Sequence, residues 1–471
     1  MCIASRQFCC ARELISTKLS GLRDELSKLT ELAVPVAIAQ VGSMLMGTVD
    51  TMMVGRVGES ALAASAIGNA WFFAVLLMGQ GVIHGIDPIV SQAHGAGDGR
   101  TAGLALQRGI VMALVLSVPL CLGLAYTNEA LLALGQDPAL AAAAHEYVAV
   151  QIPSLPIFLV FIALRQYLQG RALMRPGMWV IAIANVLNVG FNWVLIFGGF
   201  GIPALGLFGA GIATCLTRAS TLLMLVVWVS KLGLHEGAWV AWSRSAYSLR
   251  ALLVIWRSGW PVAMHMSLEI WAFSLGTLIA GMIDATSVAA HTIVLNLAAL
   301  SFMMALGISH GVVTRVGNLI GAGDPERAQH SAWVGIAMGA FVMSLGGLGF
   351  LVFRHQLPGL YTSDVGIIAA GSAVLPIAAA FQIFDGTQAV GSGVLRGMGR
   401  TLPSAAFNFI GYWVLGLPIG AWLALRGGFG LAGIWWGFVI GLAFVAVSIV
   451  MWIVWKGPSS LVVSDAQESA Q

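Results

Sequence analysis

Long apolar stretches separated by short polar turns run along almost the whole chain. Turn sequences such as GAGDGR (95–100), GQDP (135–138) and LMRPG (173–177) mark the breaks between them. A helix needs ~20 apolar residues to cross the ~30 Å hydrocarbon core of a bilayer. The pattern therefore predicts twelve membrane-spanning helices, at residues 31–56, 62–90, 104–125, 145–168, 178–199, 204–230, 251–283, 287–318, 329–353, 366–392, 402–425 and 430–455.

The composition agrees with an all-α membrane protein. Hydrophobic residues make up 58% of the 471 positions and charged residues only 9%, whereas soluble domains carry about 25% charged residues. The mean hydropathy is +0.89. No basic face is visible that would bind nucleic acid, and the five cysteines follow no metal or disulfide pattern.

The distribution of positive charge orients the predicted helices. Cytoplasmic loops of membrane proteins carry an excess of lysine and arginine. If both termini are cytoplasmic, all but four of the 23 lysines and arginines lie on the cytoplasmic side, the four being Arg56, Arg354, Arg426 and Arg218. We therefore expect a multi-pass protein of the inner (plasma) membrane with both termini inside, and Arg218 within the sixth span.

The two halves of the sequence repeat each other at an offset of 226 residues. VPVA (34–37) aligns with WPVA (260–263), and HGIDPIVSQAHGAGD (84–98) aligns with HGVVTRVGNLIGAGD (310–324). An even number of spans per half gives both halves the same orientation, so they form parallel repeats related by a pseudo-two-fold axis along the membrane normal. Such pairs of lobes commonly hold a binding cavity between them.

The repeat divides the chain into five parts. These are a cytoplasmic N-terminal tail (1–28), an N-lobe (29–230), a cytoplasmic linker (231–250), a C-lobe (251–455) and a cytoplasmic C-terminal tail (456–471). Pro35 and Pro261 each remove a backbone hydrogen bond from the first helix of a lobe. They are candidate hinges, and a static kink is the alternative for each of them.

Four carboxylates, Asp50, Asp87, Glu269 and Asp385, fall inside predicted spans. Each costs roughly 2.5–3.5 kcal/mol at the middle of the membrane, so such residues usually face a cavity and carry function. At 1.5 Å per helical residue, Glu269 lies ~18 Å and Asp385 ~16 Å from the nearest cytoplasmic arginine. Two carboxylates at one level cannot both stay charged at low cost, which predicts a site for a proton or another small cation.

A second polar cluster is predicted in the N-lobe. Asp50 lies ~21 Å from the inner face, and Asn188 and Asn192 lie ~20–25 Å from it. The two asparagines are four residues apart and share one helical face. The repeat does not reproduce these charges, because Asp50 aligns with Gly276 and Glu269 aligns with Ser43. Each polar site therefore serves a task of its own.

The remaining polar residues in the spans have structural alternatives. His265 lies one helical turn before Glu269 and is a candidate proton relay, although a satisfied buried histidine is the commoner case, as it is for His291. Asp87 precedes a proline and is expected in a local turn or a bond with His84. His84 and His310 are repeat partners, which favours a shared structural role.

The sequence carries no motif of a soluble enzyme. No Walker A loop surrounds any of the four lysines, and no HExxH zinc motif occurs. We expect no enzymatic activity, no cofactor and no resident metal. A membrane-embedded enzyme, the alternative from another class, would need histidines and carboxylates clustered at metal-ligand spacing.

Several segments in this order resemble one family of transporters. VDTMMVGRVG (49–58), SLEIWAFSLG (267–276), SVAAHTI (287–293) and FQIFDGTQAVGSGVLRGMGRT (381–401), within two six-helix halves, are similar to the multidrug and toxic compound extrusion (MATE) family, NorM type. The resemblance covers roughly residues 28–456. It implies export of cationic drugs or toxic metabolites by a monomer in the lipid bilayer, driven by inward flow of H⁺ or Na⁺.

The resemblance also assigns residues. Asp50, Asn188 and Asn192 match the polar site of the family's N-lobe, and Glu269 and Asp385 match the acidic pair of its C-lobe. Some sodium-dependent members have a tyrosine one turn before that last aspartate, where this chain has Phe381. This difference favours H⁺ as the coupling ion, with Na⁺ at Glu269 and Asp385 as the alternative. His265, His291 and Phe381 are candidates for a relay or for contact with the substrate.

A lipid-intermediate flippase of similar two-lobed architecture is the nearest alternative function. Such a protein would need a strongly cationic cavity to hold a pyrophosphate. The carboxylates predicted inside the membrane favour cationic cargo instead.

Overall fold

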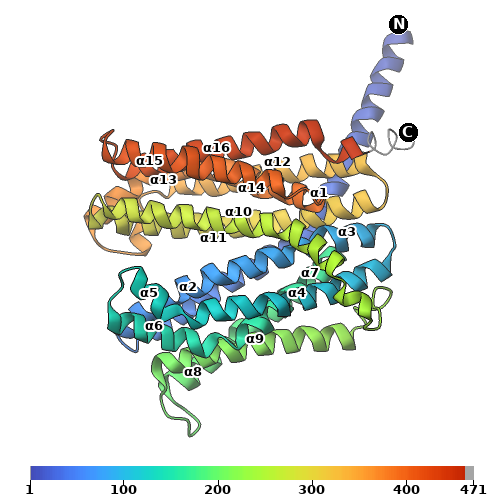
Figure 1. Ribbon diagram of the computed structural model, residues 1–471. Helices are drawn as coiled ribbons and strands as arrows, with labels where there is room; N and C mark the ends of the chain where they lie inside the picture. Colours follow the sequence, from blue (N-terminus) through green and yellow to red (C-terminus); the bar gives the residue numbers. More distant parts are fainter. Residues whose placement is uncertain (1, 462–471) are drawn as a thin grey trace.

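The computed structural model describes residues 2–461, with side chains from residue 21 onward, and the fold predicted from the sequence is confirmed. Within the described residues there is no β-strand, only an isolated bridge between Gly199 and Ile202. Eleven helices in that part are long and apolar enough to cross a membrane, and one bent pair brings the number of spans to twelve. Figure 1 shows two helical lobes side by side, with both termini near the same end of the molecule.

The N-lobe contains six spans. Its helices are α1 (Cys2–Gly55), α2 (Glu59–Ile83) continued by η1 (His84–Ile86) and α3 (Asp87–Gly95), α4 (Gly99–Ala125), the short α5 (Thr127–Ala133), α6 (Pro138–Gln151), α7 (Ser154–Gly170), α8 (Arg175–Phe197) and α9 (Gly206–Lys231). The predicted span 145–168 is not one straight helix, because α6 and α7 meet at a bend of 52°. Pro153 lies in the break, and proline both lacks the helical N–H and disfavours a helical residue before it.

The C-lobe repeats this order after a linker that contains η2 (Arg244–Tyr247). Its helices are α10 (Leu249–Gly281), α11 (Ala285–Gly321), α12 (Pro325–Val352), η3 (Pro358–Leu360), α13 (Val365–Gly397), α14 (Leu402–Asn408), η4 (Phe409–Gly416), α15 (Leu417–Leu425), α16 (Leu431–Lys456) and η5 (Pro458–Ser460). The eleventh span is wound as a π-helix over η4. Pro418 follows it and offers no N–H to the preceding turn, and π turns recur at functional sites.

The repeated GAGD sequence forms the same turn in both lobes. Gly97 and Gly323 adopt φ of 72° and 75°, a left-handed conformation that glycine adopts without steric cost. The carboxylates of Asp98 and Asp324 then accept hydrogen bonds from the backbone N–H groups of Thr101 and Arg327, each at 3.0 Å. The motif that identified the repeat is therefore a helix N-cap.

The contacts between the lobes obey the pseudo-two-fold symmetry. Gly81 of α2 lies against the backbone of Ala263 in α10, and Gly307 of α11 lies against Ala37 in α1. Adding 226 to Ala37 and Gly81 gives Ala263 and Gly307. The two contacts are therefore copies of each other, and the first helix of each half packs on the second helix of the other half.

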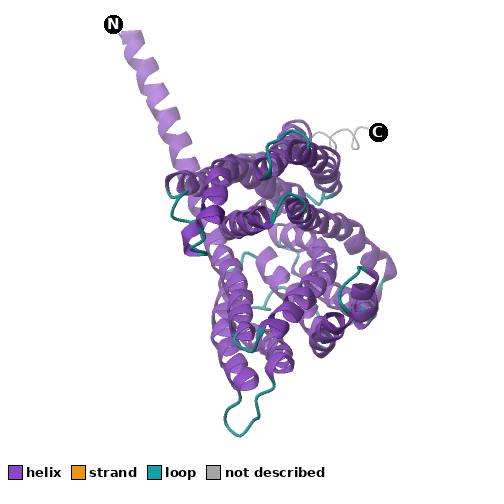
Figure 2. Cartoon of the chain, turned by 90° about the vertical axis from the view of Figure 1, so that its left-hand side faces the viewer, coloured by secondary structure: helices purple, strands orange, loops and turns teal. Residues whose placement is uncertain are grey.

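The lobes are closed against each other at one end, called here the terminal face because it lies near both chain ends. It carries the loops 96–98, 171–174, 232–248, 322–324 and 398–401. The Gln92 side chain donates a hydrogen bond to the Gly397 carbonyl at 2.9 Å, and Thr314 donates one to the Gln169 carbonyl at 3.0 Å. From this face the lobes diverge toward the opposite face (Figure 1), and Figure 2 shows the two bundles apart when viewed from that open end.

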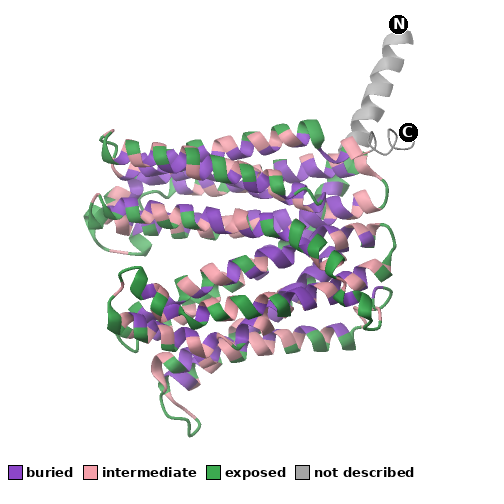
Figure 3. Cartoon of the chain, in the orientation of Figure 1, coloured by how far each residue is buried: buried purple, intermediate pink, exposed green. Residues whose placement is uncertain are grey.

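Each lobe has its own hydrophobic core, and Figure 3 shows buried positions inside the lobes with exposed ones on their outer surfaces. Many of the exposed side chains are large and apolar, such as Val186 at 73%, Leu223 at 64% and Phe341 at 63%. In a membrane, lipid chains cover such surfaces, which explains why hydropathy alone located the spans.

The glycine contacts give a first testable prediction. A Cβ atom at Gly85 would collide with the backbone of Ile255 and Gly259, whereas one at Gly123 would meet nothing within 4 Å. We expect Gly85→Ala to destabilise the protein by about 1–3 kcal/mol, the usual cost of overpacking, and to lower its thermal unfolding temperature in detergent. Gly123→Ala is the control, and equal unfolding temperatures for both variants would contradict the close packing of the lobes.

Candidate functional site

A cavity of about 620 Å³ lies between the two lobes. Its volume falls within the range of ~300–1,000 Å³ that holds drug-sized ligands. α1, α2, η1 and α7 line it from the N-lobe, and α10, α11, α13 and α14 line it from the C-lobe. Phenylalanine and methionine supply eight of the eighteen apolar residues of the wall, and methionine in particular favours adaptable contacts with varied ligands. The eight are Met44, Phe73, Phe158, Met266, Phe273, Phe302, Met303 and Phe381.

Glu269 of α10 and Asp385 of α13 lie on the wall of this cavity. They are 8% and 3% exposed, and they are close enough for their charges to interact. Asp385 Oδ1 has no hydrogen-bond partner. Binding a small cation relieves both the desolvation and the repulsion of two buried carboxylates, so the pair stays a candidate cation site.

His265 connects Glu269 to further polar groups. Its Nε2 atom lies 3.5 Å from Glu269 Oε2 and 3.0 Å from Gln388 Nε2, and its Nδ1 atom lies 3.3 Å from Ser404 Oγ. Ser404 in turn donates a hydrogen bond to Ser392 at 2.7 Å. In the neutral ring that these contacts favour, Nε2 accepts from the Gln388 amide and Nδ1 donates to Ser404.

Aromatic rings pack around the acidic pair. Phe381 lies 6.0 Å from Phe273 and 5.8 Å from Trp435, measured between ring centres. Phe381 lines the cavity, but His291 does not. The His291 ring lies 5.8 Å from Trp435, it is fully buried, and neither of its nitrogens has a hydrogen-bond partner.

Tyr412 is a residue of this site that the sequence analysis missed. It belongs to the π-helical η4, its ring lies 5.6 Å from Phe273, and its hydroxyl is buried without a hydrogen-bond partner. It is close enough to interact electrostatically with Glu269 and Asp385. The sequence did offer a signal: of the six tyrosines in the chain, only Tyr412 lies within a predicted span of the C-lobe.

The polar cluster of the N-lobe lies apart from the cavity. Asn192 donates a hydrogen bond to Asp50, and Asn188 lies close enough to interact with the same carboxylate. The Asn192 oxygen is buried without a hydrogen-bond partner. None of the three residues lines the cavity. Arg218 lies in the same region, where its guanidinium donates to Ser154 Oγ at 2.8 Å and lies 4.3 Å from the centre of the Phe72 ring.

The candidate hinge prolines lie within continuous helices. Pro35 is inside α1 and Pro261 is inside α10, and both are buried. Their role as hinges stays a prediction.

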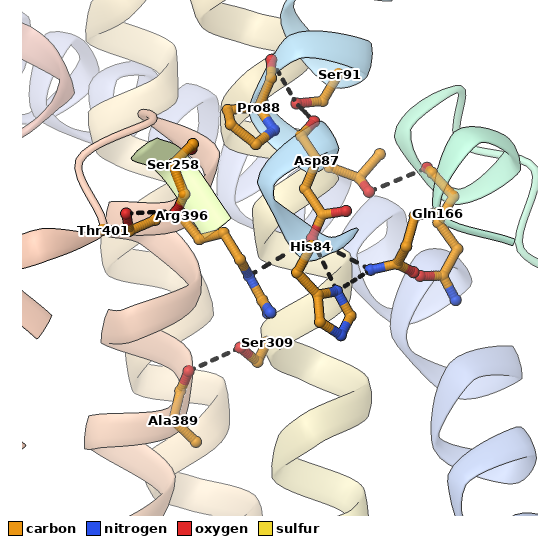
Figure 4. Close-up of polar contacts among 12 residues, drawn as sticks. His84, Asp87, Pro88, Ser91, Gln166, Ser258, Ser309, Ala389, Arg396 and Thr401 are labelled. Carbon is orange, nitrogen blue, oxygen red and sulfur yellow. Dashed lines mark hydrogen bonds and ion pairs between the residues drawn. The ribbon is translucent and has the colours of Figure 1, made fainter. Parts of the chain in front are cut away.

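Asp87 takes part in a contact between the lobes (Figure 4). Its Oδ2 atom lies 3.3 Å from His84 Nδ1, 3.2 Å from Gln166 Nε2 and 3.7 Å from Arg396 Nε. The bond with His84 was expected from the sequence, whereas the ion pair with Arg396 of the C-lobe was not. The repeat partners His84 and His310 pack together with ring centres 5.5 Å apart, as residues on a symmetry axis must.

Two arginines of the cavity wall, Arg165 and Arg396, were also missed. The count of lysines and arginines that oriented the spans assigned both to the cytoplasmic side. The structure buries both, with exposures of 6% for Arg165 and 11% for the Arg396 side chain, and both line the cavity. Arg165 lies within the predicted span 145–168, which was the available signal.

Comparison with known proteins agrees with this architecture. A family model described as MatE matches residues 35–194 and again residues 261–422, so the two matches begin one repeat offset apart. A probable multidrug resistance protein NorM from Bradyrhizobium diazoefficiens is 34% identical over 445 residues, covering 91% of this chain and 93% of the relative. The multidrug resistance protein MdtK of Yersinia pseudotuberculosis is 32% identical over 449 residues, covering 94% and 98%.

Solved structures share the fold. The eukaryotic MATE transporter AtDTX14 superimposes with a TM-score of 0.87 at 23% identity, covering 96% of this chain and 100% of the other. An outward-facing multidrug resistance transporter of the MATE family superimposes with a TM-score of 0.85 at 19% identity, covering 92% and 96%.

Proposed function

Because the chain belongs to the MATE family of multidrug efflux transporters, we propose that it is a secondary antiporter that exports organic cations in exchange for protons. The single observation that supports this proposal best is the pair Glu269 and Asp385 on the wall of a drug-sized cavity between two lobes. One pair of carboxylates there binds either the cationic drug or protons, but not both at once. Because the drug and the protons compete for the same carboxylates, the release of one is coupled to the binding of the other.

In the proposed cycle the two lobes expose the cavity alternately to the two sides of the membrane. Facing outward, the acidic pair takes up protons and releases the drug; facing inward, it loses the protons and binds the drug again. A ligand shifts such an equilibrium only through different affinities for the two states. One pH unit supplies about 1.4 kcal/mol per proton, and 100 mV supplies about 2.3 kcal/mol per charge moved, enough for tenfold accumulation without ATP.

The proposal includes an orientation in the inner membrane, with a monomer whose termini are both cytoplasmic. The surplus of lysine and arginine on the loops of the terminal face supports it. In that orientation the contacts at the terminal face close the cytoplasmic side, and the cavity faces outward.

Protons are proposed over sodium because of the groups beside the acidic pair. The ring at position 381 has no hydroxyl, although Tyr412 brings one near the pair from η4, and His265 offers a titratable nitrogen 3.5 Å from Glu269. We expect replacement of Na⁺ by choline at constant pH to leave drug efflux from vesicles unchanged, and collapse of the pH gradient to abolish it. Efflux that requires Na⁺ in the absence of a pH gradient would contradict proton coupling.

A lipid-intermediate flippase is less well supported. Arg165 and Arg396 do line the cavity, but the same wall carries Glu269 and Asp385. A pyrophosphate would meet attraction from the arginines but repulsion from the two carboxylates, and the acidic pair would have no positive group to bind; an organic cation would meet attraction there.

A further inference from the structure

Arg165 is a buried cation without a partner. Its side chain extends from α7 to the cavity wall and is 6% exposed. No described residue forms an ion pair or hydrogen bond with it, its Nε atom is buried and unbonded, and its closest aromatic contact is Phe161, at 5.7 Å from the ring centre. A buried charge without a partner is unfavourable, so an anion at this place would stabilise the protein.

The neighbouring charges do not neutralise Arg165. Asp87 is the carboxylate of this region, and it already accepts from Gln166 and lies beside His84 and Arg396. Arg165 and Arg396 thus face one carboxylate with two guanidinium groups. One positive charge is left over at this end of the cavity.

This positive end and the acidic pair belong to the same cavity. Arg396 follows Asp385 by eleven residues on α13, a separation of ~16 Å along the helix. The wall is therefore acidic at one level and basic at another, and the polar side chains of Gln388 and Ser392 line it on α13 between the two. A ligand that fills it completely would carry a positive group at one end and a negative group at the other.

We propose that Arg165, together with Arg396 on the same cavity wall, is a subsite for the carboxylate of zwitterionic cargo whose cationic group binds at Glu269 and Asp385. The planar guanidinium group matches a carboxylate through two parallel hydrogen bonds. The two arginines come from different lobes, so an anionic group between them contacts both halves of the transporter. The inference extends the proposed function, because it rests on the acidic pair as the site of the cation.

The test measures binding to the purified full-length chain in lipid nanodiscs by fluorescence polarisation. Rhodamine B is a zwitterion with one carboxylate, and its methyl ester keeps the cation but lacks the negative charge. We expect the wild-type protein to bind rhodamine B at least about tenfold more tightly than the ester, the factor that one charge-assisted hydrogen bond contributes. Benzoate is expected to weaken binding of rhodamine B but not of the ester.

Variants locate the effect. Arg165→Gln is expected to weaken rhodamine B binding about tenfold and to leave the ester unchanged, while Arg165→Lys retains part of the preference. Arg257→Gln, which removes an exposed arginine of α10 away from the cavity wall, is the matched control and is expected to change neither affinity.

Three outcomes would overturn the subsite. They are equal binding of zwitterion and ester by the wild-type protein, an equal loss of both in Arg165→Gln, and competition by benzoate against the ester as well. Failure of the proposed function looks different: Glu269→Gln would then leave binding of the ester unaffected. Binding of benzoate alone with no preference for rhodamine B would assign the site to free anions and would contradict the role in cargo binding.

Discussion

Replacing Glu269 by glutamine or Asp385 by asparagine is expected to reduce gradient-driven efflux to the level of vesicles that lack the protein. Each substitution keeps the size of the side chain and removes the charge that binds protons or drug. Both residues lie on the cavity wall and interact with each other, so neither can replace the other. The loss should exceed about tenfold, the factor that one pH unit supplies per proton. Quenching of a fluorescent cationic dye in everted vesicles measures it.

Matched controls separate coupling from folding. Glu129→Gln and Asp24→Asn make the same chemical changes at exposed positions, and they are expected to transport normally. Asp50→Asn tests the N-lobe. Because Asp50 does not line the cavity, we expect a smaller loss than for the C-lobe pair. Full efflux by both C-lobe variants, together with none by Asp50→Asn, would move the coupling site to the N-lobe.

The sequence predicted those features that follow from one helix at a time. Hydropathy located all twelve spans, because each helix must present apolar side chains to lipid along its whole length. Counting residues along regular helices put Glu269 and Asp385 at one level, since the rise per residue hardly varies. The same counting brought Asp50 to the level of Asn192, and the structure shows a hydrogen bond between them.

Contacts between helices were much harder to predict. Whether a carboxylate lines the cavity depends on how a helix is rotated and how the lobes tilt, and neither quantity is visible in a hydropathy pattern. The ion pair of Asp87 with Arg396 joins residues more than 300 positions apart across the lobe interface. Arg165 was counted as cytoplasmic because the positive-inside rule considers charges, not burial. The bend at Pro153 was also missed, although the proline itself was a readable signal.

A disulfide between the lobes at the terminal face is expected to stop transport completely and reversibly. A Cβ atom at Gly311 of α11 would lie 3.4 Å from the Leu32 Cβ atom of α1, close to the ~3.8 Å typical of a disulfide. We expect Leu32→Cys/Gly311→Cys, in a background with the native cysteines replaced, to lose efflux on oxidation and to regain it with dithiothreitol. The alternating cycle requires this contact to open once in every turnover, and a covalent bond forbids that.

The symmetry-related pair of positions is not suited to a disulfide, so only the pair Leu32 and Gly311 is chosen. The partners of Leu32 and Gly311 in the repeat are Ser258 and Gly85, and a Cβ atom at Gly85 would collide with the backbone of Ile255. The two single-cysteine variants are the controls, and both should transport with and without oxidant. Drug binding from the open side should survive oxidation, because the acidic pair stays exposed to the cavity. An oxidised double variant that still exports drug at the wild-type rate would show that the lobes do not separate at the terminal face. The drug would then have to reach Glu269 and Asp385 from the cytoplasm by another route, contrary to the proposed cycle.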